Sequence, residues 1–472
     1  MSQSLFETCH RTVAAKLFEL DKWRVGHGAM VPYLREFEKT QFQTLEQTRK
    51  GQLRELKKIV HHAIENCPFY NQRFSSVGLS VDSIHDVDDL ANFPLLDKRD
   101  IQEHHESMVA ANWPKSDLIA NYTGGSTGQP LPLYLNLDRR CQRDGGAWRH
   151  NSWAGTKLGG KIAYVWGAAF DIPSDSLKQR VRNTLIDRTL YLNSGDLTEQ
   201  NMLGFHESLK SFRPATILAY ARSLALVARY FKQQGLDVYQ PKGIITSAET
   251  LSDEDRALIE EVFGAKVFNR YGCREVSVIA SECEHHDGMH TMAECLIVEI
   301  VNAQGEPCAP GEVGSVVVTD LFNYAMPLIR YRVGDMAALK AGQCPCGRGL
   351  PMLERVEGRV TDFLVGNDGR LVSGVYVGTY LIGKCPNLGQ IQVLQERPGE
   401  LFFKVTKQPE ESDQQFIVET AKQMLGDDTL VDIEHVDEIP RTRSGKLLLC
   451  RSTATVDYLQ NQTASSTAET MK

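Results

Sequence analysis

The chain has 472 residues, a length that favours roughly two to four domains over one small module. Hydrophobic residues make up 42% and charged residues 24%, an ordinary globular composition that excludes a disordered or collagen-like chain. The formal net charge of −8 argues against binding nucleic acid over a whole basic surface, so we expect small-molecule substrates.

The eleven cysteines are scattered and form no framework of short, even spacings. Such an odd set in a long chain is typical of reduced thiols in a cytoplasmic protein. Residues 1–20 carry charges and lack the apolar core of a signal peptide. The longest apolar stretch, Ile162 to Phe170, has nine residues, about half of what a membrane-spanning helix needs. We therefore expect a soluble protein with no membrane or nucleic-acid partner.

Helical and strand patterns alternate along the first half of the chain. Apolar residues at helical spacing over 53–67 predict an amphipathic helix that Pro68 ends. Residues 215–219 and 242–247 (KGIITS) predict buried strands, and the pattern from Asp253 to Phe263 predicts a helix. This alternation predicts α/β layers.

A loop candidate for phosphate binding lies at 121–130 (NYTGGSTGQP). Its glycines leave backbone N–H groups and hydroxyls free to surround an anionic phosphate. It is not a Walker loop, because no G-x-x-x-x-G-K-[ST] pattern fits it. Taken alone, the segment is equally typical of a polar turn between strands.

The second half of the chain has a different texture. After Cys295, the runs LIVEIV and SVVVTDL flank a turn rich in Gly and Pro and predict hairpins in a β-rich subdomain. The run LFFKV and a helix near 414–424 predict a compact α+β domain at the C-terminus. The expected fold class is α/β, with a large N-terminal domain over 1–357, a small mobile α+β domain over 358–460 and a flexible tail over 461–472.

Four further segments follow the loop in a fixed order: 271–275 (YGCRE), 330–335 (RYRVGD), 358–362 (GRVTD) and 440–446 (PRTRSGK). Together the five segments resemble the signature series of the adenylate-forming superfamily, which includes acyl-CoA synthetases, luciferases and peptide-synthetase adenylation domains. The resemblance covers 121–446, most of the chain. Within the superfamily, 319–335 and 280–290 (ASECEHHDGMH) are similar to the phenylacetate-CoA ligase branch.

The resemblance implies a nucleotide site in which the loop holds the phosphates, Tyr271 lies against the adenine and Asp335 accepts hydrogen bonds from the ribose. The nucleotide-binding set it implies is Thr123, Gly124, Gly125, Ser126, Thr127, Gly128, Ser247, Ala248, Glu249, Tyr271, Gly272, Asp335 and Arg359. These residue types suit the task, since a carboxylate accepts from two adjacent hydroxyls and glycines allow close approach to phosphate.

The same resemblance implies catalytic roles for Glu275 and Lys446, and the guanidinium of Arg274, beside Glu275 in the sequence, adds a third candidate. Glu275 would bind Mg²⁺, a hard cation that takes oxygen ligands. Lys446 resembles the lysine that bridges the carboxylate and the α-phosphate, and Arg274 would place a guanidinium near that phosphate. Attack of a carboxylate on ATP builds negative charge, so cations and Mg²⁺ are the chemistry such a site needs.

Three positions depart from the common family pattern. Leu131 stands where many relatives have Lys, so one charge partner for phosphate is absent. Arg274 stands where Thr is common, and its bidentate guanidinium could compensate. Thr361 stands at the hinge position that is usually Asp or Lys. Rotation of the C-terminal domain between half-reactions is still expected, with its hinge residue unassigned.

A second group of residues has the composition of a metal site: Cys283, His290, Cys344 and Cys346. Three thiols and one imidazole predict a closed tetrahedral site of the kind that holds structural Zn²⁺. His285 or His286 could replace His290, and ordinary buried thiols with surface histidines are the other interpretation. Four protein ligands would leave no open position for catalysis by the metal.

Residues 166–170 and 218–221 are candidates to line an acyl pocket. The resemblance implies an AMP-forming acid-thiol ligase that uses ATP, Mg²⁺ and coenzyme A on an aromatic or arylacetic acid, with a homodimer as a further expectation. One alternative is an adenylating ligase whose acceptor is an amine or a carrier-protein thiol. Another is a nucleotide-binding protein without turnover, suggested by Leu131 and Thr361.

Overall fold

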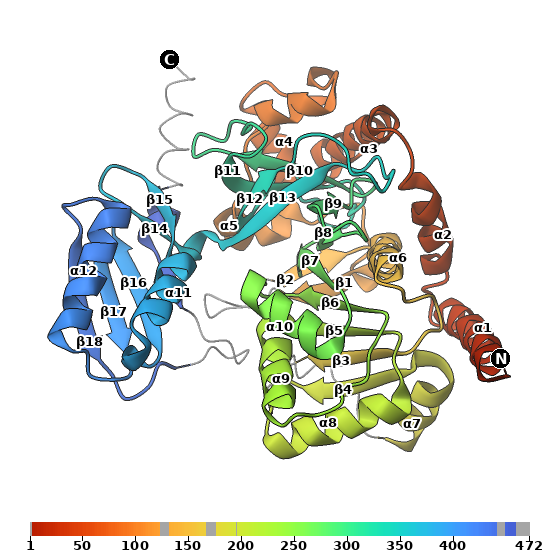
Figure 1. Ribbon diagram of the computed structural model, residues 1–472. Coiled ribbons are helices and arrows are strands. Elements are labelled where there is room, and N and C mark those ends of the chain that lie inside the picture. Colours follow the sequence, from red (N-terminus) through yellow and green to blue (C-terminus); the bar gives the residue numbers. More distant parts are fainter. Residues whose placement is uncertain (1, 123–131, 167–175, 195, 441–448, 459–472) are drawn as a thin grey trace. The chain divides into compact units, whose positions relative to one another are not determined.

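The structure is a computed structural model that describes residues 2–122, 132–166, 176–194, 196–440 and 449–458 (Figure 1). The chain divides into two compact units. The first comprises Met1–Val298, Val317–Tyr331 and Leu339–Arg355, and the second comprises Glu299–Val316, Arg332–Ala338 and Val356–Lys472. The functional boundary expected at residue 358 remains a prediction.

The helices of the first unit are α1 (Ser2–Arg24), α2 (Met30–Thr40), α3 (Leu45–Asn66), α4 (Pro68–Ser75), α5 (Lys98–Met108), α6 (Leu137–Trp153), α7 (Leu177–Arg182), α8 (Glu199–Phe212), α9 (Ala221–Gln233) and α10 (Asp253–Phe263). The second unit contains α11 (Gly374–Lys384) and α12 (Glu411–Leu425). In the part of the chain that the structure covers, none of the helices has the length and apolarity needed to cross a bilayer.

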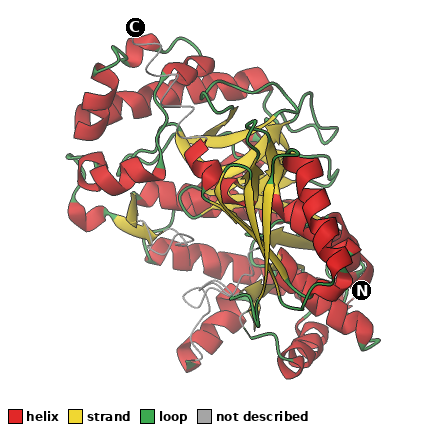
Figure 2. Ribbon diagram, turned by 90° about the vertical axis from the view of Figure 1, so that its left-hand side faces the viewer, coloured by secondary structure: helices red, strands yellow, loops and turns green. Residues whose placement is uncertain are grey.

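The strands are β1 (Ile119–Tyr122), β2 (Pro132–Leu135), β3 (Ile162–Trp166), β4 (Thr189–Asn193), β5 (Thr216–Tyr220), β6 (Gly243–Ser247), β7 (Val267–Cys273), β8 (Ser277–Glu282), β9 (Met289–Thr291), β10 (Leu296–Val301), β11 (Val313–Asp320), β12 (Tyr331–Leu339), β13 (Met352–Arg359), β14 (Phe363–Val365), β15 (Leu371–Ser373), β16 (Ile391–Arg397), β17 (Glu400–Val405), β18 (Leu430–His435) and β19 (Cys450–Ser452). The large sheet has the order β10-β11-β12-β13-β9-β8-β7-β6-β5-β3-β4. The expected α/β class is confirmed, and strands lie between helices in Figure 2.

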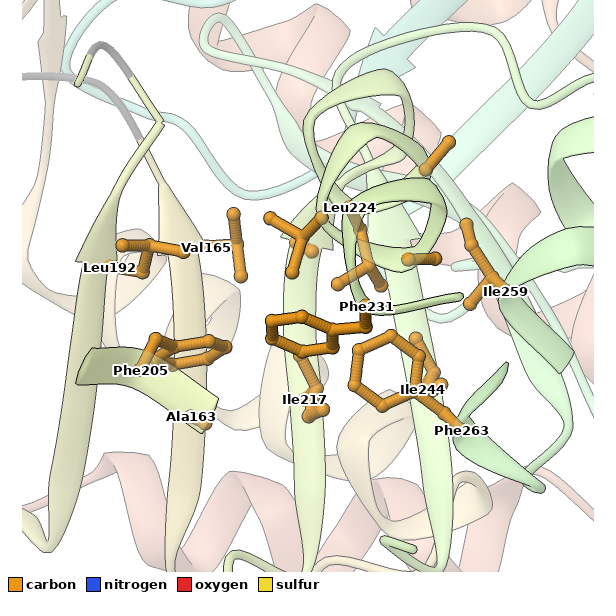
Figure 3. Close-up of a cluster of buried hydrophobic side chains, with 14 of the residues drawn as sticks. Ala163, Val165, Leu192, Phe205, Ile217, Leu224, Phe231, Ile244, Ile259 and Phe263 are labelled. Carbon is orange, nitrogen blue, oxygen red and sulfur yellow. The ribbon is translucent and has the colours of Figure 1, made fainter. Parts of the chain in front are cut away.

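Strands β3 to β7 form the parallel part of the large sheet. Their carboxyl ends therefore meet at one edge, where ligands bind in open α/β sheets. On one face, helices α8, α9 and α10 contribute Phe205, Phe231 and Phe263 to a buried cluster with strand residues such as Ile217 and Ile244 (Figure 3). This apolar layer fixes the strands that carry the candidate site residues at their ends.

Helix α6 packs on the opposite face of the same strands. Trp148 and Ala154 pack with Ile245 and Phe268 in a separate apolar cluster. The two clusters follow the alternation of side chains along β-strands, which sends successive residues to opposite faces. Strand β7 thereby gives one face to the α8 to α10 layer and the other to α6.

Local sequence signals explain why several helices begin and end at the residues expected from the sequence. Helix α10 begins after Ser252, whose hydroxyl accepts from the Asp255 N–H at 3.1 Å, and ends before Gly264 at φ +62°. A capping serine and a left-handed glycine are strong start and stop signals. Helix α3 ends before Cys67, and Pro68 is the first residue of α4, a position where its missing N–H costs nothing.

The second unit has its own core. Strands β16 to β19 form a four-stranded sheet in the order β18-β17-β16-β19. Apolar residues of α11 and α12, including Leu381 and Ile417, pack with Phe403 of this sheet. The run LFFKV is strand β17, and the helix expected near 414–424 is α12, as predicted.

Candidate functional site

A short turn at the carboxyl end of β7 carries Arg274 and Glu275. The Glu275 side chain is half-buried, and its Oε1 accepts a hydrogen bond from the Tyr331 hydroxyl at 3.3 Å. Its other carboxylate oxygen makes no hydrogen bond to any residue in the described ranges. The carboxylate is therefore oriented by one partner and keeps an oxygen for a further ligand.

Two arginines of α6 hold the backbone of this turn. Arg143 donates to the carbonyl oxygens of Arg274 at 2.6 Å and Glu275 at 3.5 Å. Arg139 donates to the carbonyl oxygen of Val276 at 3.3 Å. Three successive carbonyls are thus fixed by guanidinium groups spaced four residues apart on one helix face. Sequence reasoning missed both arginines, because a four-residue spacing of arginines on a helix is equally typical of a solvated face.

The charges of these two arginines are accommodated differently. Arg139 forms a fully buried ion pair with Asp320 at 2.7 Å, and although burial opposes the charge, Asp320 raises the pKa of Arg139. Burial, together with repulsion from Arg139, lowers the pKa of Arg143 to about 10. Both groups remain cationic near neutral pH and can only donate hydrogen bonds.

Asn121 connects this turn with the candidate phosphate loop. Its side-chain Nδ2 donates to the Arg274 carbonyl at 2.6 Å, so that one carbonyl receives both Asn121 and Arg143. Asn121 lies in β1, which pairs antiparallel with β2 and matches Tyr122 to Pro132. The loop residues from Thr123 to Gly128, and the departure at Leu131, lie outside the described residues.

The segment 247–249 follows β6 at the same edge of the sheet. Ala248 has φ +65°, a left-handed conformation that is uncommon for a residue with a side chain. Glu249 Oε2 accepts from the Arg222 backbone N–H at 3.0 Å, in the first turn of α9. This hydrogen bond joins the strand end to α9. The helix dipole stabilises a carboxylate at this position, the N-terminus of a helix.

Tyr271 and Gly272 lie in a β-bulge between β7 and β8. Tyr271 is buried. A Cβ atom at Gly272 would collide with the carbonyl oxygen of Ser277, so only glycine fits this close approach. The bulge bends the end of β7 just before the turn that carries Glu275.

The remaining predicted nucleotide residues belong to other elements. Asp335 is half-buried in β12. Arg359 is exposed at the end of β13, and its backbone N–H donates to Asp362 Oδ2 at 3.1 Å. Lys446 lies outside the described residues, and the roles of all three stay predictions.

The four predicted metal ligands converge in the first unit. The ligand atoms of Cys283, His290, Cys344 and Cys346 all lie within 4.8 Å of one another. The Cys283 and Cys344 Sγ atoms are 3.6 Å apart, and Cys346 Sγ is 3.3 Å from His290 Nε2. With Zn–S bonds of about 2.3 Å, a tetrahedral site has S···S edges of about 3.8 Å and S···N edges of about 3.6 Å. The observed spacing fits that geometry.

The fold selects one of the three candidate histidines. His290 is on β9, which pairs with β8 and β13 and brings the ring to the cysteines. His286 has φ +52° and turns its ring to Glu282, with Nδ1 3.2 Å from Oε2. His285 is exposed. Of the alternatives left open by the sequence, only His290 lies in the cluster.

The surroundings of the cluster suit a buried metal. Burial lowers the pKa of His290 to about 4, which keeps the imidazole neutral and able to bind a metal. Burial also raises the pKa of Cys283 to about 12, which opposes the thiolate form, and a bound cation would offset that cost. Burial alone would raise the pKa of Cys346, but hydrogen bonds from Arg348 outweigh it, and the pKa of Cys346 is lowered. The backbone N of Arg348 lies 3.5 Å from Cys346 Sγ. The Arg348 guanidinium is itself held by Glu284 at 2.9 Å and lies over the Trp153 ring at 4.6 Å.

Several known proteins are similar to this chain in sequence. Residues 364–452 match the family model described as the CapK C-terminal domain. The chain is 26% identical over 397 residues to the phenylacetate-coenzyme A ligase of Thermus thermophilus, covering 83% of this chain and 87% of that protein. It is 27% identical over 326 residues to the enzyme of the same name from Escherichia coli strain K12, covering 66% and 71%.

A solved structure shares the fold. The 2-hydroxyisobutyryl-CoA ligase, in its postadenylation state with 2-HIB-AMP, aligns over 90% of this chain and 93% of that one, with a TM-score of 0.65 and 19% sequence identity. The curated relatives, together with the shared fold, show a member of the adenylate-forming superfamily. Within it, the curated relatives identify the chain as phenylacetate-CoA ligase-like.

Proposed function

We propose that the protein is an ATP-dependent carboxylate ligase that forms an acyl-adenylate and then transfers the acyl group to coenzyme A. The observation that carries the proposal is the turn at 274–276, where Glu275 is oriented by Tyr331 while Asn121 and Arg143 fix the backbone. Asn121 directly precedes the candidate phosphate loop. Rigid positioning and electrostatic stabilisation are what phosphoryl-centred chemistry requires of a protein.

The chain's own residues divide the work. Thr123, Ser126 and Thr127 would hold the phosphates, and Lys446 and Arg274 would neutralise the charge that builds as the carboxylate attacks. Glu275 would supply a carboxylate oxygen to Mg²⁺, a fit supported by the oxygen it keeps unbonded. When bound, Mg²⁺ supplies further neutralisation of the phosphates.

Coenzyme A is the favoured acceptor, because the curated relatives are named phenylacetate-coenzyme A ligases. An amine acceptor is the second candidate, since an amide bond synthetase shares the fold with a TM-score of 0.50 and 15% identity. An aromatic or arylacetic acid, a homodimer and a cytoplasmic location belong to the same proposal.

The test is acid-dependent exchange of labelled pyrophosphate into ATP over a panel of carboxylic acids. Exchange with at least one acid is expected from a ligase, whereas a nucleotide-binding protein without turnover gives none. Mass analysis of the product formed with coenzyme A, and separately with amines, then identifies the acceptor.

Glu275→Gln is expected to raise the Mg²⁺ concentration needed for half-maximal exchange, because a neutral amide is a poorer ligand than a carboxylate. The Tyr331 hydroxyl can still donate to the amide oxygen, so the turn keeps its hydrogen bond. The measurement is a Mg²⁺ titration of exchange at saturating ATP. An unchanged titration removes Glu275 from the metal site.

Arg143→Met should shift the same Mg²⁺ titration in the same direction. The variant loses the hydrogen bonds to the carbonyl oxygens of Arg274 and Glu275, so the turn that positions the Glu275 carboxylate is held less firmly. If Arg143 acts through Glu275, the double variant should show less than the sum of the two single effects. Additive effects would show that Arg143 stabilises the enzyme by another route.

We also propose that Cys283, His290, Cys344 and Cys346 bind one structural Zn²⁺. The supporting observations are the mutual ligand distances and the neutral, buried imidazole. Four protein ligands occupy every position of a tetrahedral ion, so the metal would stabilise the fold and take no part in adenylation.

A further inference from the structure

One row of side chains crosses the parallel strands at their carboxyl ends, on the face that α6 covers. The register pairs Tyr220 with Ser247, and continuing the β6 to β7 pairing by one residue places Arg270 beside Ser247. At the other end of the row, the rings of Trp166 and Tyr220 are 4.2 Å apart at 40°. An aromatic pair and a cation thus occupy one edge of the sheet.

Arg270 is buried, with 8% of its surface exposed. Its Nη2 donates to Asn151 Oδ1 at 2.6 Å, and its Nε has no hydrogen-bond partner. Across the described ranges, no carboxylate forms an ion pair with it. Burial lowers the pKa of Arg270 to about 10, so the guanidinium is still charged near neutral pH.

A buried cation without a counter-charge is expensive, and proteins normally pair such groups. The group that raises the pKa of Arg270 is Tyr164, a phenol whose own pKa is raised by burial and which is therefore neutral near neutral pH. The Tyr164 hydroxyl makes no hydrogen bond to a described residue. Both groups can donate hydrogen bonds, and a guanidinium can only donate. The missing partner is therefore an acceptor, and an anionic one would best offset the charge.

The position of Arg270 relates it to the proposed reaction centre. It lies three residues before the end of β7, about 10 Å along the strand at 3.3 Å per residue. The turn with Arg274 and Glu275 follows that end. An acid whose reacting carboxylate lies by the turn could direct its opposite end to Arg270, with Trp166 and Tyr220 beside its middle.

We infer that Arg270 determines the substrate class: the acid carries a second anionic oxygen group, distal to the reacting carboxylate, that the guanidinium binds. This inference rests on the proposed function, because it concerns the acid that the enzyme adenylates. Arg270 acts in specificity and takes no part in the chemical step.

The experiment compares three acids of related shape in pyrophosphate exchange: phenylacetate, 4-isopropylphenylacetate and 4-carboxyphenylacetate. The wild type should favour the dicarboxylate over the isopropyl acid in kcat/KM. In Arg270→Met this ratio should fall by about 10²-fold, the scale of losing a hydrogen bond to a charged group. Exchange with phenylacetate should stay the same or rise.

Two further variants separate specificity from folding. Arg270→Lys keeps the charge but loses the fork, and should retain part of the preference. The matched control is Arg229→Met, which removes an exposed arginine of α9 and should leave the ratio unchanged. The melting temperature of Arg270→Met should equal or exceed that of the wild type, because an unpaired buried charge is removed.

The outcomes are distinguishable. Equal loss of exchange with all three acids in Arg270→Met and Arg270→Lys overturns the inference and makes Arg270 structural. A wild type that prefers the isopropyl acid overturns it as well, while leaving the ligase proposal intact. Absence of exchange with any acid in a wider panel overturns the proposed function and this inference together.

Discussion

Alanine in place of Lys446 is expected to lower acid-dependent pyrophosphate exchange by about 10³-fold, the scale of losing one preorganised charge that acts in the transition state. The lysine would contact the carboxylate and α-phosphate as charge develops between them, so its interaction is stronger in the transition state than in the ground state. ATP binding should therefore change little. Exchange kinetics and equilibrium ATP binding, measured on the same preparation, check both parts.

Two controls make this result specific. Lys422→Ala removes an exposed lysine in the last turn of α12 and should leave exchange unchanged. Thioester formation from pre-made acyl-adenylate should be much less affected in Lys446→Ala, because that half-reaction follows adenylation. If exchange by Lys446→Ala stays within a few-fold of the wild type, a difference of about 1 kcal/mol, the proposed role is wrong.

The sequence predicts well those elements whose limits are set by neighbouring residues. Helix α10 has the expected bounds because Ser252 and Gly264 mark its ends. Strand β6 could be predicted because its apolar run is as short as a strand and the segment after it has the pattern of a helix. These signals act over a few residues and need no knowledge of the tertiary fold.

The residues that support the candidate site could not be predicted in the same way. Asn121 and Arg143 lie 153 and 131 positions from Arg274, the residue whose carbonyl both contact. A polar residue on a helix is ordinarily solvated, and nothing local indicates that Arg139 and Arg143 face a buried turn. The proposed role of Arg270 could not be predicted for a related reason. It depends on which face of β7 the side chain occupies, and the sequence alone does not show that.

The metal cluster is an intermediate case. Ligand type alone predicted three thiols and an imidazole. The ligands that come into contact are 61 positions apart for Cys283 and Cys344 and 56 apart for His290 and Cys346, so their proximity is a property of the sheet. The pairing of β9 with β13 matches His290 to Met352, on the strand that follows the Cys344 and Cys346 loop. Choosing His290 over His286 likewise required the left-handed turn at His286.

Purified protein is expected to hold one zinc per chain without substrate, and Cys346→Ser should lose it. Ligand deprotonation and ordering of two loops accompany metal binding, so losing one thiolate should lower the free energy of unfolding by about 2 to 4 kcal/mol. The measurements are elemental analysis and denaturant unfolding. Cys308→Ser is the matched control, since Cys308 is also half-buried but lies outside the cluster.

The effect on stability should exceed the effect on chemistry. Below its unfolding transition, Cys346→Ser should retain adenylation in the folded fraction, because none of the residues proposed for adenylation is a zinc ligand. A chelator should destabilise the wild type toward the level of Cys346→Ser, and should change Cys346→Ser itself little, since its zinc is already lost. Freshly purified, unchelated protein without zinc would contradict the metal proposal. It would leave adenylation untouched, since the turn that carries Glu275 is held by α6 and β1.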